Sequence, residues 1–163
     1  MKSSCAGFWP GLLFCLFLAS PLLWPQTGNP AGNDAAGNGD PAFYIGMTLT
    51  DVIRLLGVPR SVYTVRGIEE WQDDVVFVYD DAELFIIKDR VWQAALKSAY
   101  SIRAGDSGST LILRFGYPYR SGNVNGIDFF VYPLRGYSWP IDARFNFDSD
   151  GKVSDIFIYR SDL

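Results

Sequence analysis

The same helix signal occurs twice in the sequence, and this duplication constrains the fold more than any other feature. Residues 46–59 read GMTLTDVIRLLGVP and residues 105–118 read GDSGSTLILRFGYP, so position 46 recurs at position 105. Thr48 is a favourable N-cap, and the closing glycine and proline are the residue types that end a helix and prevent its continuation. The chain is therefore predicted to contain two copies of one unit, with helices that begin near Thr48 and Ser107.

The first predicted helix is amphipathic. Leu49, Val52, Ile53 and Leu56 recur with the i, i+3, i+4, i+7 spacing of one helix face. Asp51 stands three residues after the cap, where it can complete a capping box. This helix is expected to pack its apolar face against a sheet.

Strand patterns follow each helix and are separated by short polar turns. The predicted strands are residues 61–66, which an irregular segment could also occupy, 74–79, 83–88, 91–97, 127–132, 143–148 and 153–160. The last two are joined by Ser-Asp-Gly-Lys, and Asp-Gly between alternating strands is a strong hairpin signal. The motif Phe-Val-Tyr closes a strand in both units, whereas residues 133–142 are an insertion in the second. The chain is thus predicted to be α+β, with tandem helix-plus-antiparallel-sheet repeats at residues 43–100 and 101–163.

Alternation along the last hairpin predicts which side chains face the helix. Phe145 and Phe147 alternate with polar residues and are assigned to the core. The inward set continues with Ile156 and Ile158, which places Phe157 and Tyr159 on the opposite face.

The same alternation can be transferred to the first unit by aligning the two hairpins. This alignment assigns Phe85 and Ile87 to the core. Leu84 and Ile86 then occupy outward positions, where the second unit is polar. Each sheet is expected to pack its helix on one face and to leave the other face free.

The residue types that are absent exclude several classes of function. The 163 residues include no histidine, and both cysteines, Cys5 and Cys15, lie in the N-terminal leader. The rest of the chain therefore lacks the residues for disulfides, cysteine nucleophiles, ordinary zinc sites and Ser-His-Asp triads. The net charge of −4 argues against nucleic acid as a partner, because nucleic-acid-binding proteins present basic surfaces to the phosphates. No metal and no cofactor are expected.

The N-terminus has the composition of an export signal. Residues 1–26 contain Lys2 followed by an almost wholly apolar run at 8–24, which predicts a signal peptide. A permanent anchor is the alternative, although the run is short for a membrane span and contains two prolines. Lipidation would need a small residue before Cys15, where the chain has phenylalanine. Residues 27–42, rich in Gly, Asn, Pro and Ala, are predicted to be a flexible linker or a disordered tail without a role.

The repeated pattern resembles a known family. GMTxxxVxxLLGxP, followed by Phe-Val-Tyr and a hairpin, resembles the SmpA/OmlA family, which includes the BamE-like accessory lipoproteins of outer-membrane assembly. Two such units in tandem are similar to the beta-lactamase-inhibitor-protein-like fold. The resemblance covers residues 45–162. It implies that both repeats form one curved sheet with helices on one face and a concave binding face.

An acidic run is the first candidate for chemistry. Its members are Glu69, Glu70, Asp73, Asp74, Asp80, Asp81 and Glu83. Paired carboxylates could act as general acid and base, and an acidic patch could bind a basic partner. These residues lie near turns, so solvated strand ends are the favoured interpretation, and no catalysis is expected.

A calcium loop is the second candidate. Asn146, Asp148 and Asp150 match the start of such a loop, but the twelfth position, which needs a bidentate Glu, is Phe157. A hairpin turn is therefore favoured.

Aromatic side chains are the best indication of function. Trp71 and Trp92 are assigned to the core, but the remaining aromatics exceed what two small cores need. Aromatic residues on a free sheet face are typical of protein interfaces. The predicted partner-binding residues are Tyr79, Leu84, Ile86, Tyr132, Tyr137, Trp139, Phe157 and Tyr159. Coverage of this face by the other sheet or by the insertion is the alternative.

These observations predict a secreted, non-catalytic interaction module of the bacterial cell envelope or periplasm. It would bind another envelope or secreted protein through the free face of its sheet, as an outer-membrane assembly accessory or as an inhibitor. The first alternative is a small-molecule or lipid-binding periplasmic protein, and the second is an enzyme with carboxylate chemistry. The partner's identity, membrane proximity and oligomeric state are left open.

Overall fold

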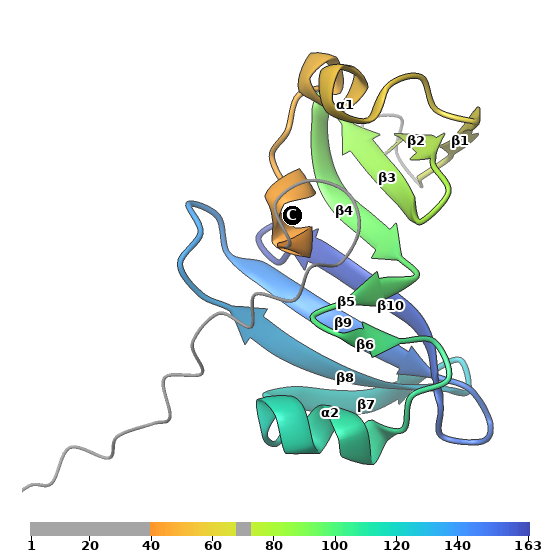
Figure 1. Cartoon of the computed structure of the whole chain (residues 1–163), viewed down its shortest axis with the longest axis vertical. Helices are drawn as coiled ribbons and strands as arrows, with labels where there is room; N and C mark the ends of the chain where they lie inside the picture. The colour runs from red at the N-terminus through yellow and green to blue at the C-terminus, as the bar shows by residue number, and fades with distance from the viewer. Residues whose placement is uncertain (1–39, 68–72) are drawn as a thin grey trace, which may run out of the picture.

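The computed structural model describes residues 40–67 and 73–163, which form a large antiparallel sheet with helices on one face (Figure 1). In chain order the elements are η1 (Pro41–Tyr44), α1 (Leu49–Leu56), β1 (Ser61–Val65), β2 (Asp74–Val78), β3 (Ala82–Ile87), β4 (Arg90–Leu96), β5 (Ser98–Ala99), β6 (Ile102–Arg103), α2 (Gly108–Phe115), β7 (Arg120–Val124), β8 (Ile127–Leu134), β9 (Ile141–Phe147) and β10 (Val153–Arg160). The predicted α+β class is confirmed, and one eight-stranded sheet joins the repeats, while β5 and β6 form a separate two-stranded sheet. The predicted signal peptide, Glu69, Glu70 and Trp71 lie outside the described residues. None of the helices in the described part of the chain has the length and apolar character needed to span a membrane.

The duplication extends from the helices to the strands that follow them. The offset that carries position 46 to position 105 also carries α1 onto α2 and β1 onto β7 with identical bounds. Both helices begin at the predicted caps. Thr48 Oγ1 accepts a hydrogen bond from Asp51 N at 3.2 Å, and Ser107 Oγ accepts one from Thr110 N at 3.3 Å. Each cap satisfies an amide of the first turn that has no partner within the helix.

The tyrosine of each Phe-Val-Tyr motif donates a hydrogen bond to the C-terminal end of a helix. Tyr79 Oη donates to the carbonyl of Gly57 at 3.1 Å, and Tyr132 Oη donates to the carbonyl of Gly116 at 3.2 Å. Both glycines follow the last residue of a helix and have positive φ. The motif therefore recurs because it joins the sheet to the closing glycine of the helix. These two tyrosines pack on the helix side of the sheet, so their predicted place on the free face is wrong.

The two repeats meet in the middle of the sheet. The strand order is β1-β2-β3-β4-β10-β9-β8-β7, so β4 of the first repeat pairs with β10 of the second. At this seam Ile158 lies opposite Ala94 of β4 on one side and Ala143 of β9 on the other. One continuous core therefore runs under both helices.

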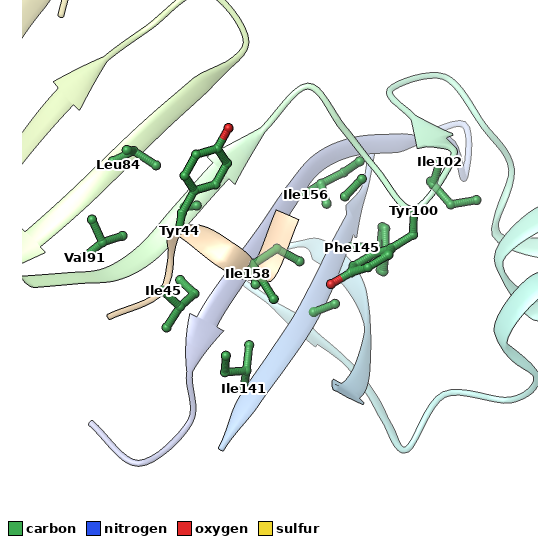
Figure 2. Packing of buried hydrophobic residues seen from close by; sticks show 14 of the residues in the cluster. Tyr44, Ile45, Leu84, Val91, Tyr100, Ile102, Ile141, Phe145, Ile156 and Ile158 are labelled. Carbon is green, nitrogen blue, oxygen red and sulfur yellow. The ribbon is translucent and has the colours of Figure 1, made fainter. Parts of the chain in front are cut away.

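Side chains from every helix contribute to this core, and Figure 2 shows its central part, where Tyr44, Ile158 and Phe145 lie. Val52 of α1 and Leu111 of α2 are buried against the sheet. Between the two helices, η1 contributes Tyr44, and the β5–β6 hairpin contributes Ile102. The helix layer is thus continuous over the seam.

Asp40 joins the N-terminal segment to the second repeat. Its carboxylate accepts hydrogen bonds from Ala42 N at 3.1 Å, Tyr100 Oη at 3.2 Å and Tyr137 Oη at 2.6 Å. Ala42 itself is buried in the core. Residues 40–42 therefore belong to the folded domain, and the prediction that the flexible linker extends to residue 42 is wrong at its end. The linker was predicted from the lack of large apolar residues, but a small residue such as Ala42 can also be buried in a core.

This cluster predicts a loss of stability at alkaline pH. Burial, with the hydrogen bond to Asp40, raises the pKa of Tyr137 to about 12 from an ordinary value of 10.0. Between these two values the unfolded chain releases the proton and the folded chain retains it, so ionisation favours unfolding. The free energy of unfolding is therefore expected to be unaffected by this group below pH 10 and to fall as the pH rises toward 12. Urea unfolding across this range, with tyrosinate absorbance as a second signal, measures the effect. Tyr137→Phe should show a smaller decline than the unmodified protein, and an equal decline would contradict the assignment.

Candidate binding face

The sheet face opposite the helices is called the open face here, and cross-strand pairing defines it. One row of neighbours consists of Tyr63, Val76, Phe85, Gln93, Tyr159, Asp142 and Pro133. A second row consists of Val78, Glu83, Ala95, Phe157, Arg144, Val131 and Arg120. Directly paired residues share a face, because side chains alternate along each strand. No helix of the described residues packs on this face, since the helical core residues cluster with the other set of strand residues.

The predicted faces of β3 are reversed. Leu84 and Ile86 are 0% and 4% exposed and face the helices, whereas Phe85 lies on the open face. The offset that relates the two helices places Leu84 on Ala143 and Ile86 on Phe145, both of which are core residues. The hairpin alignment used for the sequence prediction matched Phe85, instead of Ile86, with Phe145, and it was therefore wrong by one residue. A displacement of one residue moves every side chain of a strand to the other face.

A β-bulge brings Trp92 onto the open face. Phe85 pairs with Gln93 and Ile86 pairs with Val91, so Trp92 is the extra residue of β4 and lies beside Gln93. Its Nε1 donates to Asp74 Oδ1 at 2.9 Å. Burial raises the pKa of the Asp74 carboxyl, and the hydrogen bond from Trp92 lowers it. The assignment of Trp92 to the core is therefore wrong, because the bulge breaks simple alternation.

The predicted faces of β10 are confirmed. Ile156 and Ile158 are 1% and 0% exposed and belong to the core. Phe157 and Tyr159 stand on the open face and are partly exposed. Their role in partner binding stays a prediction.

The insertion in the second repeat contacts the N-terminal segment of the described chain at Asp40 and Gly46 and contributes little to the open face. Tyr137 packs against the core and donates to Asp40. Trp139 lies close to Gly46, where an added Cβ would be 2.9 Å from the indole Nε1. The guanidinium carbon of Arg160 lies 4.0 Å from the Trp139 ring centroid. Of these two predicted binding residues, Trp139 remains accessible in the connection between β8 and β9, and Tyr137 does not form part of the open face.

The open face is hollowed over β8, β9 and β10. The hollow has a volume of about 860 Å³. Side chains that line it include Trp92, Arg120, Asp142, Arg144, Phe157 and Tyr159. It therefore combines aromatic surface with guanidinium groups and one carboxylate.

Arg144 is positioned by two neighbours on the open face. Its guanidinium carbon lies 4.2 Å from the Phe129 ring centroid, and its Nε donates to Asn146 Oδ1 at 2.8 Å. Gly122 of β7 makes room for this ring, because a Cβ there would be 3.1 Å from it. The glycine thus allows Phe129 to lie across β7 and support the arginine.

Arg120, Asp142 and Tyr159 form the polar part of the hollow. Arg120 Nη2 donates to Tyr159 Oη at 3.3 Å. Asp142 is only 8% exposed, so burial raises the pKa of its carboxyl, and the charge of Arg120 lowers it. The pKa of Tyr159 is raised by burial and by the charge of Asp142, and the two arginines oppose this shift. Arg120, Arg144, Asp142 and Tyr159 therefore interact electrostatically within one site.

The acidic run does not form a comparable site. Arg60 pairs with Asp80, Lys97 with Asp81 at 3.8 Å, and Tyr63 Oη donates to Glu83 at 2.8 Å. Within residues 40–67 and 73–163, no group of three or more acidic residues is arranged to hold a metal ion.

The segment that resembles a calcium loop is a hairpin turn. Asp148 Oδ1 accepts hydrogen bonds from the backbone amides of Asp150 at 3.0 Å and Lys152 at 2.9 Å.

Sequence reasoning missed Trp92, Arg120 and Asp142 as members of the site. Residues 120–124 read RSGNV, which lacks the pattern of a strand, so Arg120 had no predicted face. The offset that relates the two helices also carries β1 onto β7, so this offset could have been used to predict β7. Arg144 was correctly assigned an outward direction, but the ring that supports it, Phe129, comes from β8.

Comparison with known proteins establishes similarity of fold alone. No protein-family model and no curated protein matches the chain. An extracellular protein containing a SCP domain from Bacillus anthracis matches with a TM-score of 0.51 and 10% identity, over 80% of this chain and 48% of that protein. A DUF4309 family protein (YjgB) from Bacillus subtilis matches with a TM-score of 0.48 and 14% identity, over 70% and 78% of the two chains. A putative beta-lactamase inhibitor protein from Streptococcus mutans matches with a TM-score of 0.28 and 11% identity, over 69% and 82%. The chain thus spans about half the length of the Bacillus anthracis protein.

Proposed function

We propose that this protein is an exported, non-catalytic interaction module that binds another secreted or envelope protein through its open face. The observation that carries the proposal is a complete sheet face without a helix of the described chain on it, where aromatic and arginine side chains gather. Such residues dominate the binding energy of protein interfaces. An outer-membrane assembly accessory and an inhibitor are two roles of this kind, suggested by the resemblance of the repeats.

The dimensions of the open face suit a protein better than a small ligand. Neighbouring strands lie about 4.8 Å apart, so eight strands span about 34 Å. These strands of five to eight residues are about 17–27 Å long, so the face is on the scale of the about 800 Å² that a specific interface needs from each partner. The hollow lies within this broad face.

Export is supported by the apolar leader at residues 1–26. A protein of similar fold is described as extracellular, which is compatible with that location. The proposal that the protein is non-catalytic is supported by the distribution of carboxylates, because Asp80 and Asp81, between β2 and β3, and Glu83 of β3 each contact a different partner.

Partner capture followed by mutation tests the proposal. The exported protein is immobilised, a bound envelope protein is identified by mass spectrometry, and its dissociation constant is measured against single variants. Phe157→Ala and Tyr159→Ala are expected to weaken binding by about tenfold or more, as removal of an interface anchor does. Leu113→Ala is the matched control, because Leu113 is 88% exposed on α2, on the helix side of the sheet.

Two outcomes would contradict the proposal. If Leu113→Ala weakens binding and the two open-face variants do not, the partner binds the helix layer. If no protein is captured and a lipid or small molecule copurifies, the alternative of a ligand-binding protein is supported. Besides the hollow on the open face, such a ligand would be sought in a second hollow of about 350 Å³, lined by Phe43, Met47, Asp51, Arg54 and Leu55.

A further inference from the structure

We infer that the hollow on the open face receives an acidic side chain of the partner, recognised by Arg120 and Arg144. This inference rests on the proposed function and adds the chemistry of the contact. It identifies the partner's contribution as a carboxylate next to an apolar or aromatic residue.

The first argument is the hydrogen-bonding state of the two arginines. Three arginines of the described chain, Arg54, Arg60 and Arg160, pair with carboxylates, whereas Arg90 and Arg114 donate to neutral oxygens. Neither Arg120 nor Arg144 lies within 4.0 Å of a carboxylate oxygen of the described residues. Their hydrogen bonds go to the neutral acceptors Tyr159 and Asn146.

These contacts orient the guanidinium groups and leave donors for a ligand. Arg144 uses Nε toward Asn146, and Arg120 uses Nη2 toward Tyr159. A guanidinium carries five N–H donors in a planar fork that matches a carboxylate. The ring of Phe129 beneath Arg144 also limits the entropy that the side chain loses on binding. The site is therefore preorganised for an anionic group.

The second argument is the local charge. The protein carries a net charge of −4, yet the hollow is lined by three arginines and one aspartate. Arg160 is neutralised by Asp162, which leaves two positive groups against the charge of Asp142. A positive hollow on an acidic protein favours an acidic group of the partner over a basic one.

The third argument is the apolar surface beside the charges. Trp92 and Phe157 line the same hollow. A carboxylate carried next to an apolar side chain can therefore satisfy the arginines and bury aromatic surface together. Asp142 opposes the incoming charge and so limits the affinity for a free anion that lacks the apolar group.

A pair of matched peptides tests the inference without knowledge of the partner. The probes are the acetylated dipeptide amides Glu-Phe and Gln-Phe, which differ by one charge. Binding to the exported full chain is followed by NMR through the Nε–H signals of Arg120 and Arg144. The Glu peptide is expected to bind about tenfold more tightly than the Gln peptide, because hydrogen bonds to a charged group are the stronger ones.

Variants then assign the effect to the hollow. Arg144→Gln and Arg120→Gln should each remove most of the preference for the Glu peptide, and Asp142→Asn should increase it. Arg114→Gln is the control, because Arg114 is exposed on α2 and bonds to Ser101 away from the open face. Thermal unfolding of each variant establishes that it is folded.

Each remaining outcome overturns the inference in a distinguishable way. Equal binding of the two peptides would show that charge does not select the ligand, while the proposed function would stand on its own test. Displacement of both peptides by inorganic phosphate at a lower concentration than acetate would point to a phosphate group in place of a carboxylate. Loss of the preference in Arg114→Gln would move the site to the helix side.

Discussion

Phe145→Ala is expected to lower the free energy of unfolding by about 3–5 kcal/mol, the range for deletion of a buried aromatic ring. Phe145 is 0% exposed and lies in the centre of β9, under α2. Its ring centroid lies 6.0 Å from those of both Phe115 and Tyr132, and these two rings contact each other at 5.2 Å. Truncation therefore leaves a cavity among rigid rings that cannot close around it.

Chemical denaturation followed by circular dichroism measures this loss. Phe157→Ala is the matched control, since it removes the same ring from the open face of the adjacent strand. The control should cost about 1 kcal/mol, the common size of a substitution outside a fully packed core. Equal losses for the two variants would contradict the division into a core face and an open face.

Ile158→Ala is expected to cost about 2–5 kcal/mol, whereas Tyr159→Ala should cost about 1 kcal/mol. Ile158 is buried at the seam, with Ala94 and Ala143 as its direct neighbours across the strands. Two alanines have no side-chain length with which to fill the space that the isoleucine leaves. Tyr159 lies one residue further along β10 and points to the other face.

Melting curves of these two variants decide which face of β10 is buried. The expected order is a large drop in midpoint for Ile158→Ala and a small one for Tyr159→Ala. The reverse order would mean that the faces are exchanged, and the proposed binding site would move with them.

Local signals in the sequence predicted the helices well. Caps at Thr48 and Ser107 act through neighbouring amides, so their effect is visible in a short stretch of sequence. The hairpin before β10 is equally local, because Asp148 bonds to amides within its own turn. One sheet shared by both repeats was an implication of the family resemblance, and the pairing of β4 with β10 that forms it could not be derived from local patterns.

Strand faces were harder to predict, because they depend on register. Leu84 and Phe85 are both apolar, so the pattern of β3 is consistent with either face. The extra residue at Trp92 shifts alternation within β4, and only pairing with β3 reveals it.

The candidate site was predicted in part, for a related reason. Phe157 and Tyr159 stand out as aromatic residues between two core isoleucines. Arg120 comes from β7, and Asp142 and Arg144 come from β9, and each is unremarkable in its own stretch of sequence. Their proximity follows from the order of the strands in the sheet.

The seam also governs the order in which the molecule can fold. β10 is the last strand of the sheet in the chain, yet it lies in the middle, between β4 and β9. Ile158 meets Ala94 although α2 and the strands β7 to β9 all lie between them in the sequence, and contacts between distant parts of a chain form slowly. Until β10 pairs with it, β4 is an edge strand with unpaired backbone groups that can pair with another chain. A chain that emerges from its N-terminus must therefore keep the edge of its first repeat unpaired until nearly all of the second has followed.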